Sequence, residues 1–350
     1  MSAGAGAVAP AASEQFAAAT FDAFAAGFAA SELRSEEHWC LAGRLVHARY
    51  VAPDLAARFH PTLAHLECDA GPRNHVDLDI GCWDRALTDV AVPPPPWGLD
   101  DYLPENRIRG HVDGRIRAAF DPTARILSLY DRERRQAVLH AASSDTVPDW
   151  MDRAPFRTIL TWWAADRGFA MMHASSVAWA DGAVILAGGS GAGKSTTALT
   201  CLAAGLDLLG DDACLVGLDP APHVWSVYKR AKLEPDAARW LPSLDALAVV
   251  RTEEQTHIDP GEHHRNDAPL RAVLLPQVTG ERATRAVPIA RAAAMRVLGT
   301  TTLVEGGGIA RDALTTLTAL ARDVPCLRLE LGSDLDGVAD AVRTVIENVT

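Results

Sequence analysis

The residues of this chain whose types and spacing could support chemistry lie in one glycine-rich stretch, GGSGAGKST, at positions 188–196. Gly188, Gly193, Lys194 and Ser195 have the complete spacing of a Walker A phosphate-binding loop. Backbone N–H groups in such a loop bind phosphate oxygens, and the N-terminus of the following helix adds its positive dipole at the same point. The stretch therefore predicts binding of a nucleoside triphosphate, with ATP and Mg²⁺ as cofactors.

Each part of this loop has an expected role. Lys194, which we expect to be exposed, reaches the β- and γ-phosphates, and the Ser195 hydroxyl ligates Mg²⁺. The residues expected to bind the nucleotide make up the whole loop: Gly188, Gly189, Ser190, Gly191, Ala192, Gly193, Lys194, Ser195 and Thr196.

Two adjacent carboxylates, Asp211 and Asp212, follow the apolar run 206–209. A bound triphosphate needs both a metal ligand and a general base beside it, and carboxylates at a strand end can serve as either. We expect Asp211 to hold the metal. Aspartates in turns also cap backbone N–H groups, so the pattern alone leaves a structural role open.

The elements around the loop are those that a phosphate site requires. The apolar run 183–187 predicts a buried strand, and a helix is expected to begin near Lys194 and to end at Gly205. A second apolar strand, 169–177, precedes the turn 180–182. This predicts a hairpin before the loop, whereas common nucleotidases place the loop after the first strand of a parallel βαβ unit.

His173, the glycine-rich loop and the Asp211–Asp212 pair together resemble the catalytic domain of the HPr kinase/phosphorylase family, within the phosphoenolpyruvate-carboxykinase-like P-loop architecture. The resemblance extends over about 150–218. It implies that Asp212 accepts the proton of a substrate hydroxyl and that His173 lies close to the transferred phosphoryl group. It also implies a homo-oligomer. The chain departs from the family pattern at Thr196, where the family has glutamate.

Two further segments resemble one particular group of HPr-kinase-related proteins. An Ala-Pro-x-Arg sequence at 154–157 and the Tyr-Lys-x-Ala-Lys sequence at 228–232 are similar to HPr-kinase-related serine kinases of ribosomal peptide biosynthesis, including lasso-peptide systems. The basic residues Lys229 and Lys232 are candidates for binding an acidic peptide acceptor or the γ-phosphate, although lysines on a strand edge also serve to protect it. Glu234 is the nearest candidate for a second metal ligand.

The expected fold is α/β with some α+β character. We predict a mobile or helical N-terminus at 1–35, a β-rich domain at 36–148, and an HPr-kinase-like P-loop domain at 149–350. In the β-rich domain, runs such as 41–50 predict single strands. The polar segment 252–267, which holds three histidines, predicts a solvated loop rather than a metal site.

Composition excludes several classes of partner. With 45 acidic against 33 basic residues among 350, the formal net charge is −12, which opposes association with nucleic acid or with an anionic membrane. The six cysteines form no Cys-x-x-Cys pair, which favours free thiols and a cytoplasmic protein. The histidines of the β-rich domain, His60 among them, are scattered at no metal-like spacing.

The predicted function is an ATP- and Mg²⁺-dependent kinase that phosphorylates a serine hydroxyl of a peptide or protein, with a lasso-type precursor as the acceptor that the resemblance implies. Phosphorylation of a small-molecule alcohol and a nucleotide-gated binding module without transfer activity remain alternatives. A transport or motor ATPase is disfavoured because the chain has no Leu-Ser-Gly-Gly-Gln signature and no apolar run that ends in Asp-Glu.

Overall fold

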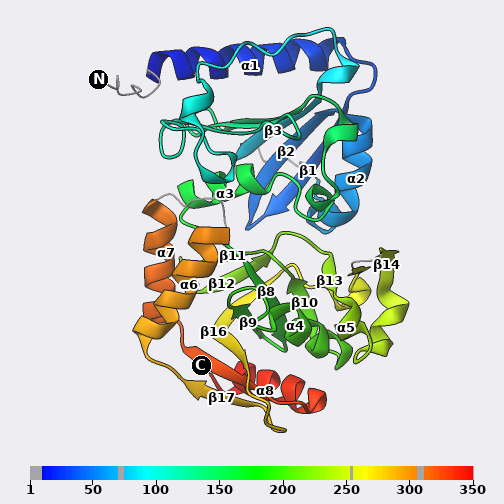
Figure 1. Cartoon of the computed structure of the whole chain (residues 1–350), viewed down its shortest axis with the longest axis vertical. Coiled ribbons are helices and arrows are strands. Elements are labelled where there is room, and N and C mark those ends of the chain that lie inside the picture. Colours follow the sequence, from blue (N-terminus) through cyan, green and yellow to red (C-terminus); the bar gives the residue numbers. More distant parts are fainter. Residues whose placement is uncertain (1–9, 70–74, 253–254, 306–310, 350) are drawn as a thin grey trace. The chain divides into compact units, whose positions relative to one another are not determined.

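The computed structural model describes residues 10–69, 75–252, 255–305 and 311–349 (Figure 1). The chain divides into two compact units, Met1–Asp166 and Arg167–Thr350. Helices and mixed sheets occur in both, so the fold is α/β, as predicted. None of the helices in the described part of the chain is both long and apolar enough to span a membrane.

The first unit is built on a six-stranded sheet with the order β1-β2-β3-β6-β5-β4. Its strands are β1 (Ser35–Leu41), β2 (Arg44–Val51), β3 (Leu78–Asp84), β4 (Ile116–Asp121), β5 (Ile126–Asp131) and β6 (Gln136–Ala141). The β2–β3 and β3–β6 pairs are parallel, and the other pairs are antiparallel.

The strand predicted over 41–50 is present as β2, but it begins at Arg44 and not at Leu41, which is the last residue of β1. A two-residue turn at Ala42 and Gly43 divides this run into the β1–β2 hairpin. Both residues have positive φ, 50° and 71°, as tight hairpin turns require. Alanine is rarely found in that conformation, which is why the turn escaped notice in the sequence.

Three helices accompany the first sheet: α1 (Pro10–Ala30), α2 (Pro53–Leu63) and α3 (Arg157–Asp166). The phenylalanine spacing in the N-terminal segment correctly predicted a helix, and α1 packs across β2, β4, β5 and β6 (Figure 1). The Phe24 ring lies directly on Gly81 of β3, where an added Cβ would be 2.6 Å from the ring. Residues 1–9, where we predicted mobility, lie outside the described part.

The junction between units lies later in the chain than the predicted boundary at 148/149. Helix α3 belongs to the first unit because its last residue is bonded to the first sheet. Asp166 accepts hydrogen bonds from Arg117 of β4 at 2.6 Å and from the Tyr130 hydroxyl of β5 at 3.0 Å. Arg117 also donates to the carbonyl of Trp162 at 3.0 Å. Since Arg117 and Asp166 are both buried, this pair ties the helix firmly to the sheet.

The second unit contains a nine-stranded sheet whose main path is β10-β8-β9-β16-β12-β11-β7, with β18 on β16 and β17 on β18. Its strands are β7 (Ala170–Met172), β8 (Ala174–Trp179), β9 (Gly182–Ala187), β10 (Asp207–Gly210), β11 (Cys214–Gly217), β12 (His223–Ser226), β16 (Asp267–Val278), β17 (Arg285–Pro288) and β18 (Cys326–Leu331). The β9–β16 and β16–β18 pairs are parallel, whereas β8 and β9 form the predicted antiparallel hairpin.

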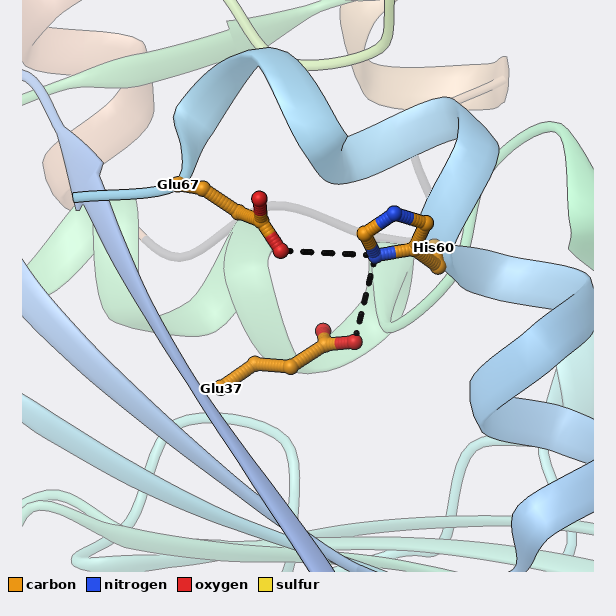
Figure 2. A group of neighbouring side chains, drawn as sticks. All are labelled: Glu37, His60 and Glu67. Atoms are coloured by element: carbon orange, nitrogen blue, oxygen red, sulfur yellow. Dashed lines mark hydrogen bonds and ion pairs between the residues drawn. The ribbon is translucent and has the colours of Figure 1, made fainter.

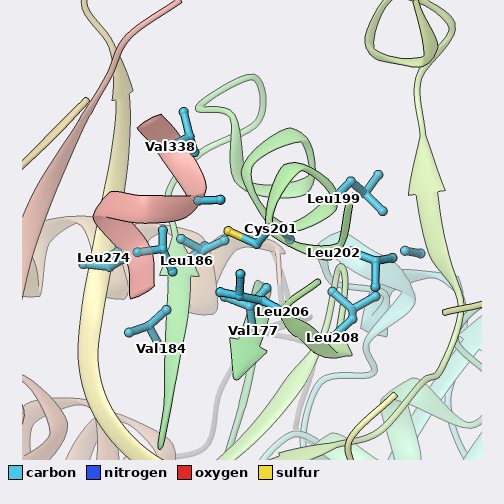
Figure 3. Close-up of a cluster of buried hydrophobic side chains, with 14 of the residues drawn as sticks. Val177, Val184, Leu186, Leu199, Cys201, Leu202, Leu206, Leu208, Leu274 and Val338 are labelled. Carbon is cyan, nitrogen blue, oxygen red and sulfur yellow. The ribbon is translucent and has the colours of Figure 1, made fainter. Parts of the chain in front are cut away.

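Helices cover both faces of this sheet. On one face, α4 (Lys194–Ala203) and α8 (Leu335–Asn348) pack on side chains such as Val184 and Leu186 (Figure 3). On the other face, α6 (Arg291–Glu305) and α7 (Arg311–Asp323) pack on Ala183 and Ile185. Alternate residues of β9 therefore face opposite apolar layers, which explains its uninterrupted apolar sequence.

A small sheet with the order β13-β15-β14 completes the second unit, next to the short helix α5 (Pro235–Ala238). Its strands are β13 (Ala231–Leu233), β14 (Ala248–Arg251) and β15 (Thr256–Ile258). The prediction of a solvated loop over 252–267 was therefore wrong in part, because β15 lies between β13 and β14. Burial there lowers the pKa of His264 to about 4.

Candidate active site

The glycine-rich loop 188–196 follows β9 directly, and α4 begins at Lys194, near which the sequence predicted a helix start. Gly191 and Gly193 have φ values of 76° and 97°, in the left-handed region that disfavours other residues. Inside the loop the Ala192 N–H donates to the Gly189 carbonyl at 3.2 Å. The loop is thus wound tightly onto the N-terminus of a helix that is anchored in the core, an arrangement suited to an anion.

Lys194 differs from expectation in its exposure. We expected an exposed side chain, whereas Lys194 is buried, with only 8% of its surface exposed. Its ammonium donates to the carbonyls of Gly188 at 2.8 Å and Gly189 at 3.3 Å. Burying a charge is costly unless it is hydrogen-bonded, and these two bonds meet that requirement. They hold the ammonium against the first two residues of the loop.

Asp211 lies at the end of β10 and is almost fully buried. Its carboxylate accepts hydrogen bonds from the Ser175 hydroxyl at 2.6 Å and from the Lys232 N–H at 3.1 Å. Burial raises the pKa of Asp211, while the hydrogen bonds from Ser175, Lys232 and the Ser195 hydroxyl act in the opposite direction.

Ser195 lies close enough to Asp211 to act on its carboxylate, so the two expected metal ligands are neighbours. A hydroxyl and a carboxylate are hard oxygen donors of the kind that Mg²⁺ prefers, and Mg²⁺ keeps several waters when it binds near phosphates. The donor set therefore fits Mg²⁺, which Ser195 would hold together with Asp211, the latter directly or through water.

His173 and Asp212 form the second pair of candidate residues in the site. His173 Nδ1 lies 3.1 Å from an Asp212 carboxylate oxygen, and the Asp212 side chain is 61% exposed against 15% for His173. Asp212 also has a positive φ of 71°. Such backbone conformations are unfavourable for residues other than glycine and cluster at functional sites. The loop conformation directs one carboxylate to solvent while Asp211 beside it remains buried.

Strand pairing explains why these residues meet. Met172 pairs with Cys214 between β7 and β11, and Ser176 pairs with Gly210 between β8 and β10. The segments between these two pairs therefore run antiparallel and side by side, so that His173 lies close to Asp212 and Ser175 close to Asp211.

Comparison with known proteins gives only distant similarity, and only to solved structures. No family model and no curated protein matches the chain. Among solved structures, the HPr(Ser) kinase/phosphatase from Coxiella burnetii is similar over 50% of this chain and 94% of that chain, with 11% sequence identity and a TM-score of 0.28. A similarity this distant carries no argument about chemistry, which rests on the geometry of the residues.

The structure gives partners to the basic residues suggested for acceptor binding. Lys229 Nζ lies 2.9 Å from Asp259, and Lys232 Nζ lies 2.5 Å from Glu234. Although burial opposes it, the hydrogen bonds from Lys229 and from the Gly261 N–H hold the pKa of Asp259 below its ordinary value. Glu234, suggested as a second metal ligand, is thus engaged with Lys232, whose backbone N–H is bonded to Asp211.

Sequence analysis did not identify Ser175 as part of the site. Its hydroxyl fixes one oxygen of Asp211, and Ser175 is completely buried. The available signal was the polar pair Ser175–Ser176 inside an otherwise apolar strand. Buried hydroxyls require hydrogen-bond partners, so such a pair indicates a polar contact nearby.

A second group of ionisable side chains lies in the first unit, where the sequence suggested only scattered histidines. His60 Nδ1 of α2 lies 3.3 Å from Glu37 of β1 and 3.4 Å from Glu67 (Figure 2). One ligand atom from each residue falls within 4.8 Å of the others, and zinc accepts such donors. Direct pairing of His60 with the two glutamates also accounts for the geometry, and because His60 and Glu67 are half-exposed, its contribution to stability is small.

Asp211→Asn provides a test of the buried carboxylate. Burial raises the pKa of Asp211, so the neutral carboxyl group favours the folded state at low pH. This contribution to stability is lost as the pH rises through the folded-state pKa. The Tm of the variant relative to the unchanged protein should therefore be higher near pH 7 than near about pH 4, apart from the pH-independent cost of replacing one of the two accepting oxygens by an N–H group. Calorimetry of the second unit's transition, with divalent ions chelated, measures both values.

The control for this experiment is Asp207→Asn, because Asp207 is only partly buried and is paired with Arg265. That variant should show no gain in Tm near pH 7. A difference in Tm for Asp211→Asn that does not change with pH would contradict the assignment of a buried carboxylate with a raised pKa.

Proposed function

We propose that this chain is an ATP- and Mg²⁺-dependent kinase that transfers the γ-phosphate to a serine hydroxyl of a peptide or protein in the cytoplasm. The observation that supports the proposal is the difference in environment between the two adjacent carboxylates. Asp211 is buried against Ser195 of the phosphate loop, whereas Asp212 is exposed and held by His173. One carboxylate is placed for a metal at the phosphates, and the other for a proton from the acceptor.

The proposed mechanism assigns each step to a residue. Asp212 accepts the proton of the serine hydroxyl as the hydroxyl oxygen attacks the γ-phosphorus and the bond to the β,γ-bridging oxygen breaks. His173 positions the Asp212 carboxylate. Lys194 and the N–H groups of the loop neutralise the charge on the transferred phosphoryl group and on the departing diphosphate. Mg²⁺, when bound at Ser195 and Asp211, would supply further charge neutralisation.

The direct test uses the full chain with ATP, Mg²⁺ and three acceptors: the peptide encoded nearest to its gene, the same peptide with every serine replaced by alanine, and a small alcohol such as glycerol. Mass spectrometry should show an added phosphate on the first acceptor alone. Phosphorylation of the alcohol would favour the small-molecule alternative. Nucleotide binding without any phosphorylated product would favour the binding-module alternative.

A second experiment concerns the acceptor side. Lys229 and Lys232 lie in the segment that follows the Asp211–Asp212 pair, and each carries its charge next to a single carboxylate. If they bind an acidic acceptor, replacing both with alanine should raise the KM for the peptide by about tenfold while the Kd for Mg·ATP stays within about twofold. Steady-state kinetics and calorimetric titration measure the two quantities.

The matched control is Arg251→Ala, which also removes an ion-paired basic residue from the small sheet. It should leave the KM for the peptide unchanged. Equal KM values for the double variant and the unchanged protein would show that the lysines have no role in acceptor binding. A higher Kd for Mg·ATP with an unchanged KM for the peptide would indicate that the two lysines bind the phosphates.

A further inference from the structure

A pocket of about 690 Å³ opens beside the phosphate loop in the second unit. The loop itself contributes Gly191 and Gly193 to its wall, and the first two turns of α4 contribute Thr196, Thr197 and Thr200. The far wall comes from the ends of β16 and β18 and from the first turns of α8. The pocket therefore lies at the carboxyl ends of the parallel strands β9, β16 and β18, where open α/β sheets bind their ligands.

The side chains that line the pocket restrict the kind of ligand that can bind there. Apolar side chains dominate, with Leu331, Leu335 and Val338 on the inside. Two large apolar side chains at the rim are unusually exposed: Trp240 at 61% and Val278 at 69%. Among the described lining residues there is no charged side chain, so hydroxyls and backbone groups supply the polar contacts. A flat, uncharged, largely apolar group matches this wall better than a charged peptide.

The pocket is continuous with the phosphate site. A Cβ added at Gly193 would lie 2.9 Å from Leu331, so the loop and the pocket wall are in direct contact. Neither of the two carboxylates of the candidate active site is part of the lining. A phosphate chain bound at Lys194 and Ser195 would therefore lie next to the part of the pocket wall formed by Thr196 and Thr197.

The far wall is held in place by backbone hydrogen bonds. The Ser333 N–H donates to the Glu281 carbonyl at 2.9 Å, and the Gly332 N–H donates to the Thr284 hydroxyl at 2.9 Å. Gly332 also lies so close to the backbone at Arg282 that an added Cβ would be 2.3 Å from its carbonyl oxygen. The pocket is preformed, which reduces the entropic cost of binding.

From these observations we infer that the pocket binds the base and ribose of the nucleotide, with Trp240 and Val278 covering the exposed side of the base. The inference depends on the proposed function, because it assumes that the triphosphate lies in the loop. It adds a specific prediction: these two residues contribute to the affinity for ATP and contribute nothing to the affinity for inorganic tripolyphosphate, which has neither base nor ribose.

The test is calorimetric titration of the full chain with ATP and with tripolyphosphate, each with Mg²⁺. Both rim side chains are exposed, so the Trp240→Ala/Val278→Ala variant should fold normally. It should bind ATP about tenfold more weakly, as expected for loss of aromatic contact with a base, and bind tripolyphosphate unchanged. Val249→Ala is the matched control, because Val249 is 48% exposed in the same unit and lies outside the pocket lining.

The outcomes separate the inference from the proposed function. Unchanged ATP affinity in the double variant, or an equal loss for both ligands, overturns the base pocket while the loop assignment stands. Failure of the unchanged protein to bind either ligand overturns the loop assignment, and the base pocket with it. ATP binding that weakens alone in the double variant supports the inference.

Discussion

Asp212→Asn should bind Mg·ATP with nearly normal affinity and lose phosphoryl transfer by about 10²- to 10⁴-fold, the usual contribution of a general base. An amide cannot accept the proton of the serine hydroxyl, although it keeps the size of the side chain and can still bond to His173. Asparagine is also among the residues that best tolerate a positive φ, so the turn at φ 71° should be retained. Single-turnover transfer rates and the Kd for Mg·ATP are the measurements.

The matched variant for this experiment is Asp211→Asn, at the neighbouring position. It should raise the Mg²⁺ concentration that half-maximal transfer requires, since Asp211 lies against Ser195 and is assigned to the metal. Equal changes in transfer rate and in Mg²⁺ requirement in the two variants would contradict separate roles as general base and metal ligand. Loss of transfer in Asp211→Asn alone, with the Mg²⁺ dependence unchanged, would make Asp211 the general base and Asp212 the metal ligand.

The second large effect is expected at Lys194. Lys194→Ala should weaken Mg·ATP binding by about a hundredfold or more and abolish transfer, because the charge that faces the phosphates is lost. Since Lys194 is buried and bonded to Gly188 and Gly189, alanine also leaves a void and an unpaired carbonyl. Lys194→Met keeps most of the side-chain volume, so it removes the charge and its hydrogen bonds without leaving a void.

Both variants should therefore be titrated with Mg·ATP and examined by thermal unfolding. The expected result is equal loss of binding, with the unfolding temperature closer to that of the unchanged protein in Lys194→Met. Full nucleotide affinity in Lys194→Met would overturn the assignment of the loop.

Some features of the site depend only on neighbouring residues, and these could be predicted from the sequence. The loop spacing, the start of α4 at Lys194 and the β8–β9 hairpin are all encoded within short segments. Local backbone geometry, glycine positions and apolar runs are enough to specify them. The α/β class follows in the same way from strands and helices that are recognisable one by one.

Other features depend on which segments pair, and only the tertiary structure decided them. The register between β7 and β11 and between β8 and β10 places His173 beside Asp212 and Ser175 beside Asp211. Burial then makes the two adjacent carboxylates chemically different. A sequence shows two identical aspartates, whereas their ionisation depends on distant residues that exclude water or donate hydrogen bonds.

The same reason accounts for the remaining differences. Lys229 and Lys232 look like a free basic patch in the sequence, but Asp259 and Glu234 lie against them in the folded chain. The pocket beside the loop draws its wall from residues between Gly191 and Val338. The composition of one segment does not reveal such a surface, because it forms only when strands far apart in the sequence end at the same edge of a sheet.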